Sequence, residues 1–339
     1  TINDSGIIAF TIGSEKISKS GYKIAASHTD SPGFLIKPSP EINRKGFNIL
    51  NTEVYGGPIL STWFDRPLSF SGRVFVEGDN AFKPKKYFIN YDKDLFIIPS
   101  LCIHQNRGVN DGMAINAQKD TLPLVTITDD KEKFSLKKLL AKQLKVKEDK
   151  ILSYDLNLYS REKGCLLGAN EEFISAPRID NLVSVYAGLL GLVESEHNQK
   201  QINVFVAFDN EEIGSATKQG ADSNYLIHTL ERIVLGLGYT RENFLRMLSG
   251  SFMLSADAAH AAHPAHMNKT DPTSRGRINE GISVKISARQ KYTSDGFSTS
   301  VIKQIIDGTD IKIQPFVNES NELGGSTIGP ISSTHLEID

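Results

Sequence analysis

The 339-residue sequence predicts an α/β fold that is interrupted by a β-rich insertion. Two observations support this prediction. Patterns typical of buried strands alternate with helical periodicity before about residue 32 and from about residue 172 onward, as they do in α/β domains. Residues 33–170 instead hold short β segments between turns rich in Gly, Pro and Asp. We therefore expect a discontinuous domain, residues 1–32 plus 171–339, and an inserted domain, residues 33–170, with hinges at Pro32-Gly33 and Gly164–Ala169.

Three strands and one helix of the discontinuous domain can be placed from the spacing of their apolar residues. The strands are predicted at residues 21–27, 202–208 and 251–256, each a short run of apolar and small side chains. A helix is predicted to open within residues 176–181. Apolar side chains then recur at helical spacing, at Leu182, Val185, Tyr186, Leu189, Leu190 and Val193.

Within the insertion, β segments are predicted at residues 74–76, 86–89 and 124–127. A basic stretch from Lys131 to Lys150 follows them. It carries leucines at helical spacing, at Leu136, Leu139, Leu140 and Leu144. We interpret this stretch as an amphipathic helix with a solvated lysine face rather than as an anion-binding surface.

The most informative feature is the pair Glu211-Glu212, which comes shortly after the strand predicted at residues 202–208. Two adjacent carboxylates at the end of a buried strand repel each other, and desolvating them is costly without nearby cations. Metal-dependent hydrolysis tolerates such a pair, because one carboxylate binds a cation while its neighbour takes a proton from the attacking water. Taken alone, the pair is equally compatible with a solvated turn whose acids lie near a helix N-terminus.

Three other positions favour the metal interpretation. His28 follows the strand predicted at residues 21–27, Asp257 follows the strand at 251–256, and Asp180 lies at the predicted helix start. Each has an ordinary explanation by itself: a buried, hydrogen-bonded histidine, a turn acid or a helix cap. Ligands of an open α/β sheet gather beyond the carboxyl ends of its strands, however, so one shared site explains all of these residues together.

The types of ligand indicate which metal such a site would hold. One imidazole with several carboxylates suits Zn, Mn or Co. The two cysteines, Cys102 and Cys165, lie far apart, which excludes a zinc site that depends on two or more thiolates. The carboxylates suffice for two ions about 3.5–4 Å apart, with Asp180 as the natural bridge. Asp30 lies two residues after His28 on an extended segment and can therefore orient its imidazole.

The same residues carry a resemblance to the M18 family of metalloaminopeptidases, the aspartyl aminopeptidases. Seven blocks match in the order of the family and cover nearly the whole chain: His28–Pro32, Glu53–Gly57 with Thr62–Arg66, Ile98–His104, Ala176–Asn181, Phe208–Ser215, Ser255–His260 and Gly325–Pro330. The resemblance implies a mixed-sheet α/β/α domain of the zinc-exopeptidase type, interrupted by a β-rich dimerisation domain. It also implies a homo-oligomer, a dodecamer built from dimers.

The resemblance assigns roles to matching positions of this sequence. It makes four residues ligands of two divalent ions, with Zn as the first choice and Mn or Co as alternatives: His28, Asp180 as the bridge, Glu212 and Asp257. Glu211 becomes the general base and proton shuttle, and Asp30 becomes the acid that orients the imidazole.

Three further positions are implied to contact substrate or to be supplied in trans to the metal site, namely His104, His260 and Lys285. The pattern alone gives two of them plainer roles. Lys285 lies in the alternating segment 281–287 and would be a lysine on the wet face of a sheet. His104 would be an ordinary surface histidine of a loop.

The sequence departs from the family pattern at both ends. The family places a last histidine ligand in a Met-His-Ser block, and this chain stops at Leu336–Asp339 before such a block. His335 falls too early and lacks the flanking residues, so we do not assign it as a ligand. A helical segment of the family would also precede Thr1. The resemblance thus predicts a fragment, or the ordered part of a longer protein, without one metal ligand.

Composition narrows the class of protein. The 38 basic and 40 acidic residues give a formal net charge of -2, which offers no reason to invoke nucleic acid. No apolar run approaches the ~20 residues that span a bilayer. Two separated cysteines give no disulfide framework, which is typical of a reducing compartment. We therefore expect a cytoplasmic enzyme that acts on peptides and has no membrane partner.

Three functions remain open at this stage. A binuclear metalloaminopeptidase would release the N-terminal residue of a peptide, with Asp and Glu as candidate first residues. A carboxypeptidase or an aminoacylase-type zinc amidohydrolase would use a similar His-x-Asp and Glu-Glu arrangement. A non-catalytic scaffold homologue is disfavoured, because a scaffold has no use for two crowded, buried carboxylates.

Overall fold

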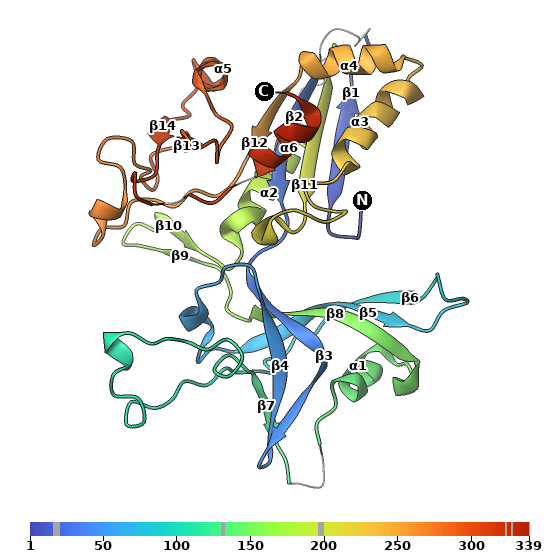
Figure 1. Cartoon of the computed structure of the whole chain (residues 1–339), viewed down its shortest axis with the longest axis vertical. Helices are drawn as coiled ribbons and strands as arrows, with labels where there is room; N and C mark the ends of the chain where they lie inside the picture. Colours follow the sequence, from blue (N-terminus) through green and yellow to red (C-terminus); the bar gives the residue numbers. More distant parts are fainter. Residues whose placement is uncertain (16–20, 130–132, 196–199, 323, 327, 339) are drawn as a thin grey trace. The chain divides into compact units, whose positions relative to one another are not determined.

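The computed structural model describes residues 1–15, 21–129, 133–195, 200–322, 324–326 and 328–338 (Figure 1). The backbone divides into two compact units, Thr1–Ser31 with Arg178–Asp339, and Pro32–Pro177. The first boundary therefore lies after Ser31, where the sequence predicts it after residue 32. The second lies after Pro177, where the sequence predicts it after residue 170.

A hairpin accounts for the later second boundary. Strands β9 (Cys165–Leu167) and β10 (Phe173–Ser175) pair antiparallel with each other and belong to the inserted unit. The residues that the sequence predicts as the second hinge, Gly164–Ala169, therefore contain a strand of this hairpin.

The discontinuous unit is built on a four-stranded mixed sheet in the order β1-β11-β2-β12 (Figure 1). Strands β11 (Ile202–Phe208), β2 (Tyr22–His28) and β12 (Phe252–Ser255) run parallel, and β1 (Ile7–Ile12) is an antiparallel edge strand. The three parallel strands are the ones predicted from the apolar runs, so these predictions are confirmed to within one residue at each end.

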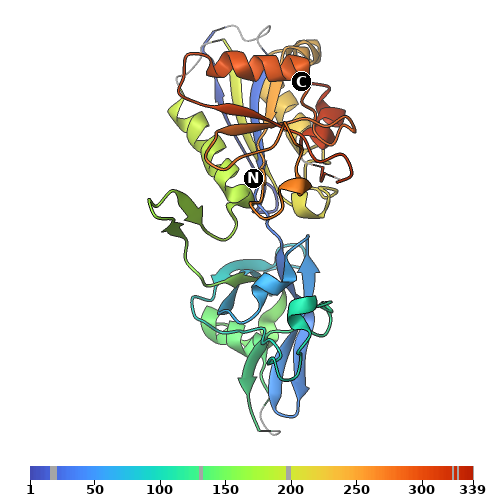
Figure 2. The ribbon, with the colours of Figure 1, turned by 90° about the vertical axis from the view of Figure 1, so that its left-hand side faces the viewer.

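Helices cover both faces of this sheet, which confirms the predicted α/β/α fold. One face of β2 and β11 shares a core with α3 (Tyr225–Gly236), α4 (Arg241–Ser249) and α6 (Ile328–Leu336). Fully buried Tyr22 belongs to this core, and its hydroxyl donates to the Leu230 carbonyl at 3.1 Å. The opposite face carries α2 (Ile179–Glu194), as the two ribbon views show (Figures 1 and 2).

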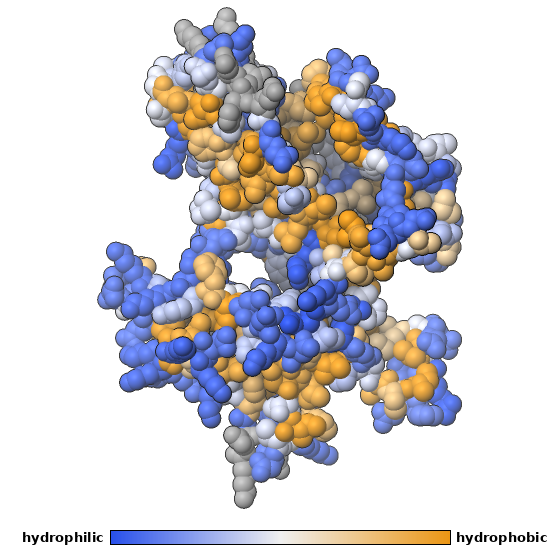
Figure 3. Space-filling model, turned by 180° about the vertical axis from the view of Figure 1, so that it is seen from behind, coloured by the Kyte–Doolittle hydropathy of each residue, from blue (hydrophilic) through white to orange (hydrophobic). Residues whose placement is uncertain are grey.

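The outward face of α2 is apolar. Charged residues occur only near its two ends, at Asp180 and Glu194, and Tyr186 and Val193 are 68% and 72% exposed. A helix that is hydrophobic all round is normally covered on all sides. Figure 3 shows apolar side chains gathered on the visible face of the unit that carries α2.

The remaining elements of this unit form a smaller group. Strands β13 (Ile282–Lys285) and β14 (Ile313–Phe316) pair parallel in a separate two-stranded ladder, and α5 (Gly296–Ile306) lies between them in sequence. The alternating pattern at residues 281–287 is thus confirmed as a strand.

The inserted unit is dominated by an antiparallel six-stranded sheet. Its order is β6 (Lys85–Asn90), β5 (Leu68–Val76), β8 (Ile151–Ser160), β3 (Gly33–Arg44), β4 (Phe47–Tyr55) and β7 (Leu124–Ile127). Helix α1 (Leu136–Leu144) packs its fully buried Leu136 and Leu140 against this sheet, beside Phe34 and Phe70. The predicted β segments and the amphipathic helix are confirmed, while Lys131 lies outside the described residues.

Short 3-10 turns complete the chain: η1 (Leu60–Trp63), η2 (Val109–Asp111), η3 (Glu148–Lys150), η4 (Glu211–Ile213) and η5 (Met267–Lys269). Among the residues that the structure describes, no helix is both long enough and apolar enough to cross a membrane.

Two glycines of α2 test how this helix packs on the sheet. A Cβ at Gly188 would lie 2.7 Å from Cε2 of Phe205, whereas a Cβ at Gly191 would meet nothing within 4 Å. Gly188→Ala is expected to lower the free energy of unfolding by about 1–3 kcal/mol, because the contact with the ring is overpacked. Gly191→Ala is expected to raise it by roughly 0.5–1 kcal/mol, because alanine loses less backbone entropy in a helix. Denaturant unfolding followed by circular dichroism measures both, and equal effects would contradict this packing.

Candidate metal centre

Parallel strand pairing brings the predicted ligands to one edge of the sheet. His28, the last residue of β2, lies opposite Phe208, the last residue of β11. Ser255, the last residue of β12, lies opposite Ala26 of β2. The backbone N–H of Thr29 donates to the Phe208 carbonyl at 2.8 Å, which continues the pairing beyond the strands. The chain segments that follow β2, β11 and β12 therefore emerge side by side.

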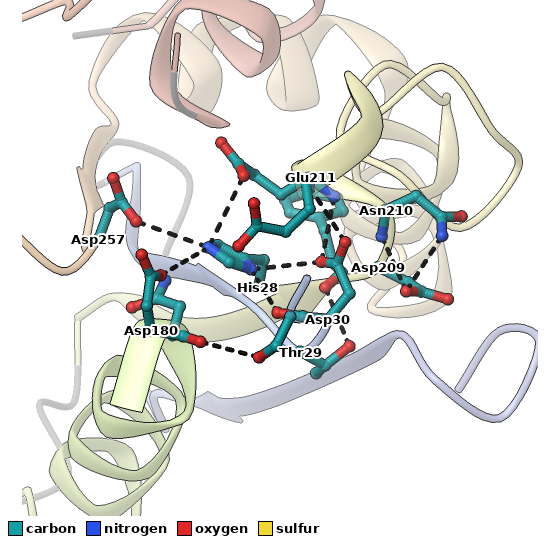
Figure 4. A network of polar contacts seen from close by, with 12 residues as sticks. His28, Thr29, Asp30, Asp180, Asp209, Asn210, Glu211 and Asp257 are labelled. Carbon is teal, nitrogen blue, oxygen red and sulfur yellow. Dashed lines mark hydrogen bonds and ion pairs between the residues drawn. The ribbon is translucent and has the colours of Figure 1, made fainter. Parts of the chain in front are cut away.

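The His28 imidazole lies at the centre of a group of carboxylates (Figure 4). Its Nε2 is 3.4 Å from Asp180 Oδ1, 3.5 Å from Asp257 Oδ1 and 3.8 Å from Glu211 Oε2. The side chain of His28 is only 1% exposed. His28 belongs to two groups of possible metal ligands, one with Glu211 and Glu212 and the other with Asp180 and Asp257. Within each group, the ligand atoms all lie within 4.8 Å of one another.

Asp30 connects the imidazole to the two glutamates. Its Oδ1 lies 3.2 Å from His28 Nδ1, on the ring side away from the other carboxylates. The two carboxylate oxygens of Asp30 also accept hydrogen bonds from the backbone N–H groups of Glu211 and Glu212, both at 3.1 Å. The sequence pointed only to the contact with the imidazole. The second role follows a general rule, because open N–H groups at the start of a helical turn favour a carboxylate.

Asp180 is held by its backbone and not as a helix cap. Its φ of -77° and ψ of 111° are not helical, and no side chain caps the N-terminus of α2. Among the described residues, no hydrogen bond supports the ordinary explanation of Asp180 as a helix cap. The Ser31 hydroxyl donates to the Asp180 carbonyl at 2.8 Å, and the side chain of Asp180 stays 54% exposed.

Asn181 is a structural residue of the site that sequence reasoning missed. It is fully buried, and its side-chain nitrogen donates to the Ala256 carbonyl at 2.9 Å. This bond ties the start of α2 to the segment between β12 and Asp257. A polar residue at the head of an otherwise apolar helix was the signal that could have revealed it.

Burial and mutual repulsion shift the titration of the site. Burial raises the pKa of Glu211 to about 7, against the opposing charge of His28. Burial likewise raises the pKa of Glu212 to about 7, and the negative charges of Asp180 and Glu211 act in the same direction. These are the shifts expected where carboxylates crowd in a partly buried site.

The pKa shifts of His28 and Asp257 instead favour the charged form of each group. Burial would lower the pKa of His28, but hydrogen bonds to Asp180, Asp257 and Asp30 raise it to about 12. Burial would raise the pKa of Asp257, yet its contacts with His28 and Lys285 hold that pKa below its usual value. Positive charge is thus strongly favoured between these acids.

The donor set fits a divalent cation. It offers one imidazole nitrogen and carboxylate oxygens from converging chain segments, and no thiolate is among them. Such nitrogen and oxygen ligands suit Zn, Mn or Co. The contact of His28 Nδ1 with Asp30 leaves Nε2 facing the other carboxylates, which is the arrangement usual for a metal-binding histidine.

Two of the residues implied to contact substrate lie on or against the β13–β14 ladder. The Lys285 ammonium donates to Asp257 Oδ2 at 2.7 Å and lies 5.5 Å from the centre of the Tyr292 ring. Lys285 is 15% exposed, so the interpretation as a lysine on a wet sheet face is wrong. The His260 ring meets Phe316 edge-on at 5.0 Å, and Phe316 lies opposite Lys285 in the β13–β14 ladder.

His104 and His335, the other two histidines considered in the sequence analysis, have different settings. His104 is exposed within the unit Pro32–Pro177, so its role in trans stays a prediction. His335, which was not assigned, lies at the end of α6 and pairs through Nε2 with Asp222 Oδ1 at 2.8 Å.

Comparison with known proteins decides the family. The model of the aminopeptidase I zinc metalloproteases (M18) matches residues 1–339. This chain belongs to the M18 family. It is 51% identical to the "Probable M18 family aminopeptidase 2" of Clostridium novyi over 341 residues, which covers 100% of this chain and 78% of that relative. A relative with the same description from Clostridium acetobutylicum is 52% identical over 339 residues, covering 99% and 78%.

Solved structures share the fold. A chain of the Ape4 and Nbr1 complex matches with a TM-score of 0.94 and 34% identity, over 100% of this chain and 68% of that one. An M18 aminopeptidase from Thermotoga maritima matches with a TM-score of 0.84 and 21% identity, over 97% of this chain and 75% of that one. The predictions of the family and of a metalloaminopeptidase are therefore confirmed.

The raised pKa values predict how metal affects stability at different pH. In the metal-free protein, the contribution of Glu211 and Glu212 to folding stability is fully present below their ordinary pKa of 4.5 and is lost as the pH rises through about 7. The contribution of His28 to folding stability is fully present below its ordinary pKa of 6.5 and is lost as the pH rises toward about 12. The protein without metal should therefore lose stability as the pH rises from 5.5 to 8. Bound divalent cations should offset this loss, because they stabilise the ionised forms of Glu211 and Glu212. We expect the Tm gain from added Zn to grow over this range.

Scanning fluorimetry with Zn or with a chelator measures this gain. The double variant Glu211→Gln with Glu212→Gln is the matched control, because it removes both titrating acids and should flatten the dependence on pH. A gain from Zn that is constant across pH in the unmodified protein would contradict the assignment of these acids to the metal centre.

Proposed function

We propose that this protein is an aminopeptidase that hydrolyses the N-terminal residue from peptides with two co-catalytic divalent ions. The observation that carries the proposal is the convergence of His28, Asp180 and Asp257, and of His28, Glu211 and Glu212, within 4.8 Å in each group. Membership of a zinc metalloprotease family supports peptide hydrolysis as the reaction.

The balance of charge supports two ions. When ionised, five acids contribute five negative charges to the site: Asp30, Asp180, Glu211, Glu212 and Asp257. The Lys285 ammonium supplies one positive charge, and a metal-binding imidazole is neutral. The remaining four negative charges equal the charge of two divalent cations. Zn is the first choice from the family, and Mn or Co suits the same donors.

Residues around these ions have separate catalytic and positioning roles. Bound divalent cations would polarise the scissile carbonyl and make water a better nucleophile. Glu211, whose pKa burial raises to about 7, can take a proton near neutral pH and pass it to the leaving amine. Asp30 positions Glu211 through the backbone N–H and His28 through Nδ1. Lys285 orients Asp257 through its 2.7 Å hydrogen bond.

Glu212 shares the raised pKa of Glu211, so the separate roles of the two residues rest on the resemblance to the family. His28, Asp180, Glu212 and Asp257 are assigned as ligands on the same basis. Asp180 is proposed as the bridge between the ions, which its open, half-exposed carboxylate supports.

A preference for Asp or Glu as the first residue is the second part of the proposal. Lys285 is the nearest described cation to Asp257, and an acidic side chain of the substrate could share its ammonium. Because Lys285 already donates to Asp257, this preference would depend on how strongly the ions compete for that carboxylate.

We also propose a homo-oligomer, a dodecamer built from dimers through the inserted unit. The mApe1 of S. cerevesiae, 23% identical with a TM-score of 0.83, is described as a dodecamer. The outward face of α2, with Tyr186 and Val193 well exposed, supports association, because such apolar faces are normally covered. His104 would reach a neighbouring subunit only in such an assembly.

Mass photometry of the full-length protein tests the assembly. A dodecameric mass is expected, with dimers as the principal species on dilution. A monomer that cleaves peptides at full rate would contradict both the assembly and the role of His104 in trans.

Separate substitutions of the adjacent glutamates test their roles. Glu211→Gln is expected to lower kcat by about 10²–10⁴-fold while the protein keeps its metal, because it removes the general base. Glu212→Gln is expected to lower the metal content itself. Metal analysis by mass spectrometry is combined with release of the first residue from Asp-, Glu- and Leu-peptides, with and without chelator. The reverse pattern, metal lost in Glu211→Gln and kept in Glu212→Gln, would exchange the two roles.

Peptides with an acetylated N-terminus are the matched substrates. We expect no cleavage of them, because an aminopeptidase needs the free N-terminal amine. Their cleavage would favour a carboxypeptidase or an aminoacylase-type amidohydrolase. A metal-loaded, assembled protein without turnover would instead favour a scaffold.

A further inference from the structure

The carboxylate of Asp180 is held only weakly through its own side chain. Among the residues that the structure describes, its one polar partner is His28, whose Nε2 lies 3.4 Å from Oδ1. Asp257 approaches the same nitrogen at 3.5 Å (Figure 4). Because the side chain of Asp180 is 54% exposed, packing does not fix it either. The position of this carboxylate beside Asp257 is therefore set by the backbone of Asp180.

The Ser31 hydroxyl holds one side of that backbone. It donates a hydrogen bond to the Asp180 carbonyl at 2.8 Å. Ser31 directly follows Asp30, which itself contacts the His28 imidazole. The bond therefore joins the start of α2 to the segment that carries the groups around His28.

The Asn181 side chain holds the other side. Its nitrogen donates to the Ala256 carbonyl at 2.9 Å. The Ala256 N–H in turn donates to the Ala26 carbonyl of β2 at 2.8 Å, so Ala256 is itself fixed to the sheet. Asp257 comes directly after Ala256. Asn181 thus ties the residue next to Asp180 to the residue next to Asp257.

The Asn181 amide also has an energetic cost. The residue is fully buried, and its Oδ1 has no hydrogen-bond partner among the described residues. A buried acceptor without a partner is unfavourable, and an apolar side chain of the same shape would avoid this cost. Packing alone therefore does not account for an amide at this position. Its donor group, which fixes the Ala256 carbonyl, does.

Both hydrogen bonds lie near the points where the chain leaves and re-enters the discontinuous unit. Ser31 is the last residue of this unit before the insertion, and Arg178 is the first residue after it. Arg178 has a left-handed φ of 62°, and no side chain of the described residues caps the N-terminus of α2. The local structure of the helix start thus contributes little to the position of Asp180, and the bonds of Ser31 and Asn181 replace it.

The two glutamates have a separate support. The Asp30 carboxylate accepts the backbone N–H groups of Glu211 and Glu212, both at 3.1 Å. Among the described residues, neither Ser31 nor Asn181 makes a hydrogen bond to this turn. The two groups of candidate ligands are therefore positioned by different hydrogen bonds.

We propose that Ser31 and Asn181 form a clamp that positions Asp180 against Asp257 and thereby sets the affinity for the ion that these two acids bind. The clamp consists of the Ser31–Asp180 and Asn181–Ala256 hydrogen bonds. Both are positioning residues, because each acts through the backbone of a neighbour. The inference rests on the proposed two-metal function, since it requires an ion at these acids. A carboxylate that bridges ions ~3.5–4 Å apart tolerates little displacement.

Zinc titration of the full-length protein after removal of metal tests the clamp. In Ser31→Ala, we expect the affinity for one of the two ions to fall by about 10–100-fold, the usual effect of losing a group that orients metal ligands. The affinity for the other ion should change little. Calorimetry in the presence of a competing chelator resolves the two binding steps, and Asp257→Asn identifies the step that belongs to the clamped site. The Tm of the metal-free variant should match that of the unmodified protein, because Ser31 is partly exposed.

Matched variants separate positioning from a general loss of stability. Ser31→Thr keeps the hydroxyl and should restore both affinities. Ser195→Ala removes a similar bond at the other end of α2, where the hydroxyl donates to the Leu192 carbonyl at 3.1 Å, and should keep both affinities. Asn181→Ala should weaken the same ion as Ser31→Ala. Since Asn181 is buried, its loss should also lower the metal-free Tm, so the Ser31 variants are the decisive ones.

The outcomes distinguish the clamp from the function on which it rests. If the unmodified protein binds fewer than two zinc ions, the two-metal function and the clamp are both overturned. Two ions bound by Ser31→Ala as tightly as by the unmodified protein overturn the clamp alone. Equal weakening of both ions, or a loss that Ser31→Thr does not restore, also overturns it, because a general disturbance of the site then explains the effect.

Discussion

The candidate metal centre depends on the parallel pairing of β2 with β11 and β12. Parallel strands end at the same edge of a sheet, and neighbouring strands lie ≈ 4.7–4.9 Å apart. This spacing places His28 and the segments that carry Glu211 and Asp257 within reach of one another. A slip of one residue in β2 would turn His28 to the opposite face of the sheet. The buried, apolar side chains of β2 and β11 prevent such a slip, so the core that stabilises the sheet also sets the geometry of the site.

The same convergence has an electrostatic cost. Burial at the end of the sheet, together with repulsion between the crowded carboxylates, raises the pKa values of Glu211 and Glu212 to about 7. Asp30 offsets part of this cost, because its oxygens accept the two backbone N–H groups of the glutamate turn and approach the imidazole of His28. The rest of the negative charge favours cations. Metal binding and folding stability are therefore linked in this protein.

The β13–β14 ladder extends the chemistry beyond the metals. At one end, Lys285 contacts Asp257 and His260 packs on Phe316, so the ladder forms a wall beside the candidate ligands. The ladder belongs to the unit that carries the metal centre.

The sequence by itself determined the parallel strands and the acids that follow them. The run at residues 202–208 matches β11 to the residue, because a short apolar stretch rich in β-branched side chains has few other stable conformations. The positions of His28, Glu211 and Asp257 at or beyond strand ends could be predicted for the same reason, while the separate roles of Glu211 and Glu212 came only from the family. The backbone of Asp180, the partner of Lys285, the second role of Asp30 and the burial of Asn181 were decided by tertiary structure. Each depends on contacts between segments far apart in the chain, and the spacing of residues along one segment carries no information about such contacts.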